Sequence, residues 1–406
     1  MKHSWRLHFF TVLLLVSMGS ASEPMHLRAL VDLVSATPEA LSYKVKTESV
    51  RKQGDASRAY PAPTLGIEWG SRGESPGMSD KRMPYGGVVV GQEFMFPGKR
   101  KAMQDMEGSR IRKSVSESRI RILDMQHALA QSYLELQEIQ WRTRWLDTLG
   151  ILLLAERKAM EREYQTGMAS DEGRFELQNQ LIRYRLDSMN LVVEKARMHS
   201  MVASVLGSDS ILLPESIHLR IGALPDSAEV EARIQQHPQV QDMQEMIGMA
   251  KSELRVAELN QKPDIMLNAK YMAMEGPDEW SLMAGVSLPF APWSKASKTA
   301  RIQGTQQDIR SLEWRLQSMQ AMLRLEALGL LEQIRLLGER AQAMESPVLE
   351  NSKTTAGMIL ANRRMQWMNQ ESNLMARQEW LKACLALERI LGVTPGTWLQ
   401  EVTNEP

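Results

Sequence analysis

Apolar and polar positions alternate in two stretches of each half of the chain, and this pattern predicts four β-strands. In residues 264–274 the odd positions are apolar, whereas the even positions include Asn268 and Lys270. In residues 280–288 the even positions are apolar instead, and a hairpin at about 62–96 alternates in the same way. Strands of about ten residues with one apolar and one polar face are typical of membrane β-strands. Half-buried strands of a soluble sheet alternate similarly, so both interpretations stand at this point.

Each predicted strand pair is followed by a long segment with a heptad pattern of apolar positions. The first run extends from Ile111 to Ile139, with spacings that alternate between four and three. The second begins at Ile309 and shifts phase after Leu323, which is typical of a stutter in a coiled coil. Residues 102–164 contain no proline and would span roughly 90 Å as one helix. A helix of this length predicts an extended coiled-coil structure.

The two halves of the chain repeat one plan of helix, strand, strand, long helix, break and helix. Pro38 and Pro238 open the corresponding first helices, and Gly167 and Gly357 mark the corresponding breaks. Four strands are too few to close a water-filled barrel, so several chains must contribute if these strands lie in a membrane. The predicted segments are a signal peptide at 1–21, a first repeat at 22–220 with its hairpin at about 62–96, a second repeat at 221–392 with its hairpin at about 263–290, and a C-terminal tail at 393–406.

The N-terminus has the three parts of a secretory signal. Lys2 and Arg6 precede a short apolar segment, and small residues follow at 19–21. An N-terminal anchor helix is the alternative, but the apolar segment is short for one. The chain without its signal is nearly neutral, which gives no electrostatic case for nucleic-acid binding. Cys384 is the only cysteine, so an intrachain disulfide is impossible and a lipidated cysteine cannot stand at the mature N-terminus.

The stretch QEFMFPGKR, at residues 92–100, superficially resembles a phosphate-binding loop. A P-loop needs a glycine five positions before the Gly-Lys pair and a hydroxyl residue after it, but Gly91 lies seven positions before Gly98 and Arg100 follows Lys99. We therefore interpret the stretch as the exit from a strand into a long helix. Lys99 and Arg100 are expected to be solvated at this junction.

The sequence contains no recognisable catalytic motif. Its histidines are far apart, and neither an HExxH motif nor a Cys/His cluster is present, so we predict no enzyme activity, no cofactor and no metal site of that type. The chain has 28 methionines, and Met266, Met272, Met274 and Met283 fall on the polar face of the predicted strands. Thioethers favour soft Cu(I), although methionine also fills apolar gaps as a flexible packing residue.

With these features the chain resembles the TolC-like outer-membrane efflux proteins over about 36–392. The resemblance is carried by HPQVQ and AKSELRVAELNQKPDIML at the start of the second repeat, by GVSLPF and by FPGKR. Within that family the chain looks most like the branch that serves heavy-metal efflux systems. The resemblance implies an α+β membrane protein in which a long coiled-coil α-barrel continues into a trimeric 12-stranded β-barrel with four strands per chain. The implied partners are two further copies of the chain, a periplasmic adaptor, an inner-membrane pump and outer-membrane lipid.

The implied function is a passive exit channel in the outer membrane with a periplasmic helical tunnel. The alternative is a secreted periplasmic coiled-coil scaffold without channel activity, and the cargo (metal ions, organic compounds or proteins) stays open. Candidate residues of the periplasmic tip are Gly167, Asp171, Glu172, Gly357, Arg363 and Arg364. We hypothesise that Asp171 or Glu172 pairs with Arg363 or Arg364 to hold the tip closed. Candidates for the luminal strand face are Glu68, Glu93, Asn268, Lys270, Met272 and Met283.

Overall fold

A computed structural model describes most of the chain, and its residues divide into two compact units. The described residues are 26–56, 59–72, 83–166, 171–207, 219–274, 278–287, 292–343 and 356–401. The predicted signal peptide at 1–21 and the predicted break at Gly167 lie outside them. Two long helices, α4 (Lys99–Gln165) and α8 (Pro292–Ala343), contribute to both units.

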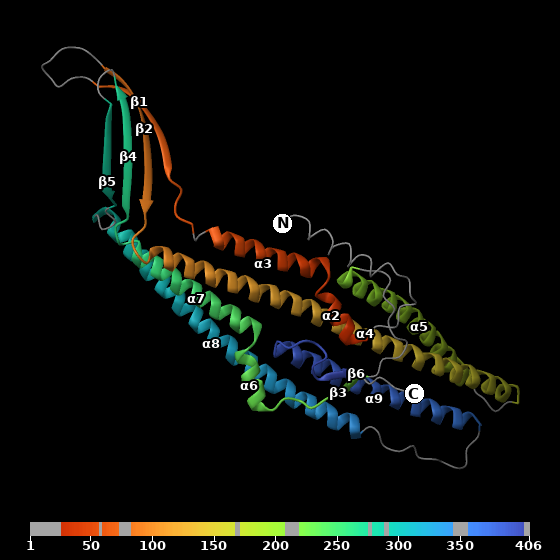
Figure 1. Cartoon of the computed structure of the whole chain (residues 1–406). Coiled ribbons are helices and arrows are strands. Elements are labelled where there is room, and N and C mark those ends of the chain that lie inside the picture. The colour runs from red at the N-terminus through yellow and green to blue at the C-terminus, as the bar shows by residue number, and fades with distance from the viewer. Residues whose placement is uncertain are drawn as a thin grey trace. The chain divides into compact units, whose positions relative to one another are not determined.

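One unit, formed by Tyr43–Arg119 and Pro238–Ala321, carries a four-stranded antiparallel sheet. The strand order is β1-β2-β4-β5, so the two hairpins of the repeats lie side by side and join through β2 and β4 (Figure 1). The strands are β1 (Thr64–Arg72), β2 (Met83–Phe94), β4 (Ile265–Met274) and β5 (Glu279–Val286). All four fall within the hairpins that the alternating pattern predicted.

Four helical segments of the same unit pack laterally in the order α3, α4, α7 and α8. The helices α3 (Pro38–Ala56) and α7 (Pro238–Leu259) both contact α4. Contacts that join neighbours are a 3.2 Å hydrogen bond from Thr47 to the carbonyl of Ser114, a 2.8 Å ion pair between Arg112 and Glu245, and a 3.0 Å ion pair between Lys251 and Glu313.

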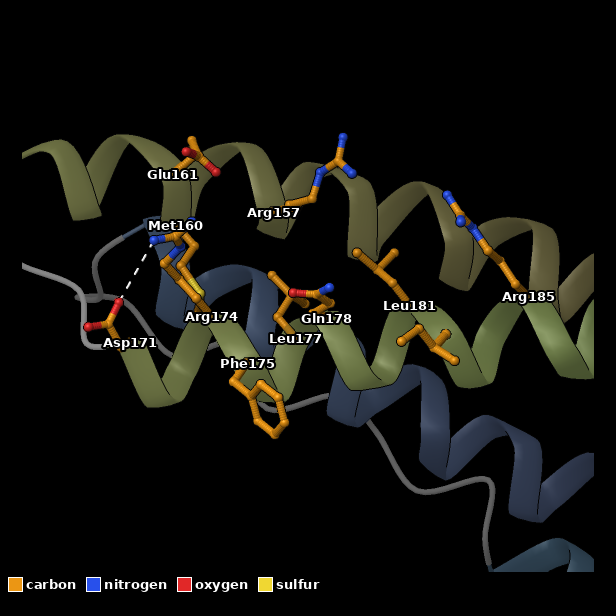
Figure 2. Close-up of a pocket in the computed structure, with 11 residues that line it drawn as sticks. Arg157, Met160, Glu161, Asp171, Arg174, Phe175, Leu177, Gln178, Leu181 and Arg185 are labelled. Carbon is orange, nitrogen blue, oxygen red and sulfur yellow. Dashed lines mark ion pairs between the residues drawn. The ribbon is translucent and has the colours of Figure 1, made fainter.

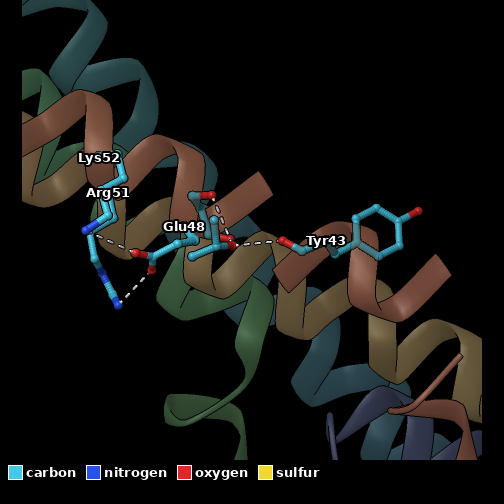
Figure 3. A network of polar contacts seen from close by, with 6 residues as sticks. Tyr43, Glu48, Arg51 and Lys52 are labelled. Atoms are coloured by element: carbon cyan, nitrogen blue, oxygen red, sulfur yellow. Dashed lines mark hydrogen bonds and ion pairs between the residues drawn. The ribbon is translucent and has the colours of Figure 1, made fainter. Parts of the chain in front are cut away.

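Polar side chains also line the exposed surface of α3, where Glu48 pairs with both Arg51 and Lys52 (Figure 3). These i,i+3 and i,i+4 pairs are half exposed to solvent, and such pairs contribute little to stability. These ion pairs support the helix only slightly, and its packing depends on the apolar positions.

The other unit is helical with a two-stranded sheet. Helix α2 shows how the pattern decides burial, since Leu27, Leu30, Val31 and Val34 are all buried at the i, i+3, i+4, i+7 spacing of one helix face. The further elements of this unit are α5 (Asp171–Leu206), β3 (Leu219–Ile221), α6 (Ser227–Gln235), α9 (Ala356–Ile390) and β6 (Leu399–Glu401), with α2 at Leu27–Val34. In α4 the heptad positions Leu129, Ser132, Leu136 and Ile139 are buried, as expected of a coiled-coil face.

The C-terminal end of α9 is held to β6 by a buried carboxylate. Glu388 is fully buried and accepts hydrogen bonds from the backbone N–H groups of Gly396, Trp398 and Leu399, at 3.0, 2.6 and 3.2 Å. Burial raises the pKa of this carboxyl, although the backbone donors act in the opposite direction. The three hydrogen bonds satisfy an anion that would otherwise be costly to bury.

His127 of α4 contacts the same C-terminal segment. Its Nε2 atom lies 2.9 Å from the carbonyl oxygen of Val393 and donates to it. Burial lowers the pKa of His127 to about 4, so the ring is neutral at physiological pH.

The architecture confirms the fold that the sequence predicted, with one strand pair, one long helix and one returning helix in each half. Helix α4 alone has 67 residues and includes the whole proline-free stretch at 102–164. Among the described residues no helix has both the length and the hydropathy to cross a membrane.

Candidate functional site

The junction between sheet and helices is organised around one buried ion pair. The Lys99 Nζ atom lies 2.6 Å from Asp264 Oδ2, and the Phe96 backbone N–H donates to Asp264 Oδ1 at 2.8 Å. The two charged side chains are only 11% and 14% exposed. Burial by itself would raise the pKa of Asp264, but the hydrogen bonds from Lys99 and Phe96 outweigh burial and lower it. Gly98 turns the chain into α4 with a φ of 91°, which lies in the left-handed region that glycine favours.

The expectation that Lys99 is solvated was therefore wrong, whereas Arg100 is only partly buried. Lys99 is buried against Asp264, and the Arg100 guanidinium lies over the ring of Tyr60, 4.3 Å from its centroid. The strand-exit interpretation of this stretch is confirmed, because β2 ends at Phe94 and α4 begins at Lys99. The partner of Lys99 could not be inferred from the local sequence.

One face of the sheet is a continuous apolar surface. Because directly paired residues of neighbouring strands point to the same side, the register defines two apolar rows across the sheet. One row is Leu65, Val90, Ala269 and Leu282, and the other is Ile67, Val88, Tyr271 and Trp280. Apart from Ala269, these side chains are between 42% and 80% exposed in the single chain. An apolar surface of this extent needs a partner, either lipid or protein.

The opposite face is polar and rich in glycine and methionine. All six residues predicted for a luminal strand face lie on it, because their positions alternate with the apolar rows. Its rows are Glu93, Met266 and Gly285; Thr64, Gly91, Asn268 and Met283; Gly66, Val89, Lys270 and Ser281; and Glu68, Gly87, Met272 and Glu279. Lys270 and Glu68 form an ion pair across β2. That these side chains face a lumen stays a prediction.

Glycine at two positions of β2 allows the polar side chains to lie across this strand. A Cβ atom on Gly91 would be 2.5 Å from Asn268 Oδ1 and 2.6 Å from Thr64 Oγ1. A Cβ atom on Gly87 would be 2.8 Å from the carbonyl oxygen of Tyr271. These contacts are shorter than a side chain tolerates, so glycine is required for the close approach.

A second candidate region lies where α4 ends and α5 begins. A cavity of about 450 Å³ opens between these two helices, and Figure 2 shows its side chains. Arg174 lies 3.8 Å from Asp171 and stacks on Tyr164, with 4.1 Å between its guanidinium carbon and the ring centroid. The lining residues are Arg157, Met160, Glu161, Asp171, Arg174, Phe175, Leu177, Gln178, Leu181, Ile182 and Arg185.

The structure places some of the predicted tip residues and leaves others outside its description. Asp171 and Glu172 are exposed in the first turn of α5, and Gly357 lies in the first turn of α9. Arg363 and Arg364 belong to α9, but their side chains are outside the described part of the chain. The pairing of Asp171 or Glu172 with these arginines therefore stays a prediction. The sequence interpretation missed Arg174, which the i,i+3 spacing from Asp171 could have indicated.

The described residues contain no group of three His, Cys, Asp or Glu side chains that could hold a metal ion. The methionines Met266 and Met283 are a different kind of candidate, because both are exposed on the polar face of the sheet. Their sulfur atoms are soft, neutral donors.

No family model matches the chain, and no curated protein matches it either. Solved structures do. The outer-membrane channel OprN superimposes with a TM-score of 0.74 at 16% identity, over 90% of this chain and 89% of OprN. CusC, whose structures concern folding and transmembrane channel formation, superimposes with a TM-score of 0.71 at 15% identity, over 93% of this chain and 96% of CusC. The outer membrane protein VceC of Vibrio cholerae superimposes with a TM-score of 0.68 at 16% identity, over 90% of this chain and 96% of VceC.

The chain thus has the fold of outer-membrane channel proteins. This is the fold that the sequence resemblance to the TolC-like outer-membrane efflux proteins predicted.

Proposed function

We propose that the chain is one of three identical subunits of an outer-membrane efflux channel. The observation that carries this proposal is the sheet with one exposed apolar face, one polar face and two open edges. The polar face would line the lumen, and the apolar face would contact lipid. The channel fold of the solved neighbours supports the same function.

The open edges explain why several copies are needed. Among the described strands, β1 and β5 each pair on one side only. An open edge in the bilayer would leave backbone N–H and C=O groups without partners, at a cost of several kcal/mol for each group. Pairing β5 of one copy with β1 of the next removes these edges, and three copies supply twelve strands. Twelve is within the size range of outer-membrane barrels.

The channel would be passive, with energy and cargo delivered by other proteins. As the resemblance to efflux channels implies, an inner-membrane pump would drive transport and a periplasmic adaptor would connect the pump to the channel. The adaptor would dock at the turn between α4 and α5 and its counterpart between α8 and α9. The resemblance to the heavy-metal branch favours metal cations as cargo. Growth of a deletion strain on copper and silver salts, compared with dyes and bile salts, tests this choice.

Cross-linking between sheet edges tests the subunit arrangement. Gly66 and Ser281 lie in one row of the polar face, on β1 and β5. Three strand spacings separate them within one chain, roughly 14 Å, which is too far for a disulfide. A disulfide between Gly66→Cys and one of Glu279→Cys, Ser281→Cys or Gly285→Cys must therefore join two chains. We expect at least one of these pairs to give covalent trimers in isolated outer membranes.

The native cysteine provides a clean background for this experiment. Cys384 is buried, and burial raises the pKa of its thiol to about 12, so it is unreactive at neutral pH. The single variants serve as controls and should stay uncross-linked. If no pair cross-links and the protein is released with periplasmic contents, the secreted-scaffold alternative is correct instead.

A further inference from the structure

We propose that the thioethers of Met266 and Met283 form a binding site for a soft monovalent cation, Cu(I) or Ag(I), on the polar face of the sheet. The site depends only on the sheet, whereas its role in transport rests on the channel function proposed above.

The register places the two methionines as diagonal neighbours on adjacent strands. Met266 of β4 pairs with Gly285 of β5, and Asn268, two residues further along β4, pairs with Met283. Met266 and Met283 therefore point to the same side of the sheet. The Cβ atoms of such diagonal neighbours are roughly 7 Å apart or somewhat less. Glycine at 285 leaves the space between them open, since no side chain projects there. Two flexible methionine side chains span this separation with a metal ion between their sulfur atoms.

Exposure distinguishes these two residues from methionines that fill a core. Met266 is 47% exposed and Met283 is 63% exposed, on a face that otherwise carries mostly charged, amide, hydroxyl and glycine residues, with Val89 and Met272 as its other apolar side chains. Met198 of α5, by contrast, is almost completely buried. A flexible apolar residue on a polar surface contributes no packing, so packing does not explain why methionine stands at these two positions.

The surrounding charges favour a cation of low charge. Glu93 of β2 pairs directly with Met266 and supplies one exposed carboxylate next to the thioethers. Lys270, the nearest cation on this face of β4, is paired with Glu68. Neutral sulfur donors favour Cu(I) and Ag(I), whereas Mg²⁺ and Ca²⁺ favour oxygen donors. The site is therefore selective by the softness of its ligands rather than by charge alone.

The position of the site suits a cargo that arrives from the helical side. Met266 is the second residue of β4, next to the strand end that joins the helices through Asp264 and Lys99. In the proposed channel, each of three chains would place one such site near the entrance to the strand region. Weak binding at this position does not slow transport through a wide channel, but it raises the local concentration of the soft cation.

Silver binding to the purified full-length protein tests the proposal. Ag⁺ is titrated as the nitrate in chloride-free buffer, and bound silver is measured by equilibrium dialysis and elemental analysis. We expect Met266→Leu/Met283→Leu to lose one equivalent of Ag⁺ per chain, or to bind it at least 10-fold more weakly. Leucine keeps the side-chain volume close to that of methionine. The control Met189→Leu/Met322→Leu removes two comparably exposed methionines of the helices and should leave binding unchanged.

Each outcome decides the question. Equal isotherms for wild type and the Met266→Leu/Met283→Leu protein would refute the site, as would competition by Mg²⁺ at an equal concentration. The single variants Met266→Leu and Met283→Leu should each weaken binding, which provides the same test if the double variant does not assemble. Conductance in planar bilayers is measured in parallel. Loss of silver binding with normal conductance supports the site, whereas silver binding without any conductance would leave the site standing and refute the channel function.

Discussion

Tyr184 of α5 lies directly on Gly150 of α4, so closely that a Cβ atom at position 150 would be 2.5 Å from both the ring carbon Cζ and the hydroxyl oxygen. The second repeat contains a similar contact, in which a Cβ atom on Gly338 of α8 would be 3.4 Å from the Trp380 indole of α9. In each half an aromatic side chain of the returning helix thus packs onto a glycine of the long helix. Glycine is needed at position 150 for this close approach.

The first prediction follows from this contact. Gly150→Ala should lack the stabilisation that alanine ordinarily brings to a helix interior and should destabilise the protein by up to about 2 kcal/mol, because the added methyl group forces the Tyr184 ring out of its position. Gly304→Ala in α8 is a matched control, since nothing lies within 4 Å of the added atom. That substitution should stabilise the helix by about 1 kcal/mol. Thermal unfolding followed by circular dichroism gives both values. In a Tyr184→Ala background the cost of Gly150→Ala should largely disappear; an undiminished cost would show that this contact is not its cause.

The second prediction concerns the ion pair at the junction of sheet and helices. Asp264→Asn should cost about 3 kcal/mol, because it leaves the buried Lys99 ammonium without a counter-charge. Adding Lys99→Met should recover most of this loss, since the double variant contains no unpaired charge. Chemical unfolding of the four proteins of this cycle measures the coupling. If Asp264→Asn costs the same with and without Lys99, the ion pair does not hold the junction.

The third prediction is a pH dependence that arises at His127. Its pKa is about 4 in the folded chain and 6.5 ordinarily, so the unfolded chain binds a proton first as the pH falls. The contribution of neutral His127 is therefore complete above pH 6.5 and is lost between pH 6.5 and 4, up to about 3 kcal/mol. His127→Gln keeps a donor for the Val393 carbonyl and does not titrate. The difference in unfolding temperature between wild type and this variant should shrink on acidification, and a constant difference would contradict the assignment.

The fourth prediction separates the two faces of the sheet. Val88 and Val89 are neighbours on β2, but Val88 pairs with Ile67 and Tyr271 on the apolar face, whereas Val89 pairs with Lys270 on the polar face. Val88→Glu should reduce the amount of trimer in the outer membrane several-fold, because a carboxylate on a lipid-facing surface is destabilising. Val89→Glu should assemble normally beside Lys270. Similar yields for both variants, compared by fractionation and gel electrophoresis, would show that the assignment of faces is wrong.

Much of this fold could be predicted because its elements are regular and long. The alternation around Asn268 and Lys270 assigned the residues of β4 to two faces before their neighbours were known, since side chains of a strand alternate strictly. The heptad run through Leu129 and Leu136 likewise predicted a buried helix face. The contacts at the tip were harder to predict from the sequence, because the proposed partners of Asp171 lie on a different helix. The structure places Arg174, from the same helix, beside Asp171.

The sequence by itself thus determined the kinds of elements, their order and the composition of each strand face, because these depend on periodicities within short segments. Only the tertiary structure decided which segments meet. Lys99 and Asp264 are 165 positions apart, and the local sequence around either residue does not indicate the other as its partner. The same holds for Gly150 and Tyr184, and for the register that brings Met266 and Met283 to one side of the sheet. Such pairings are set by how chain segments pack in three dimensions, where shape and buried charge decide between partners that look equivalent along the sequence.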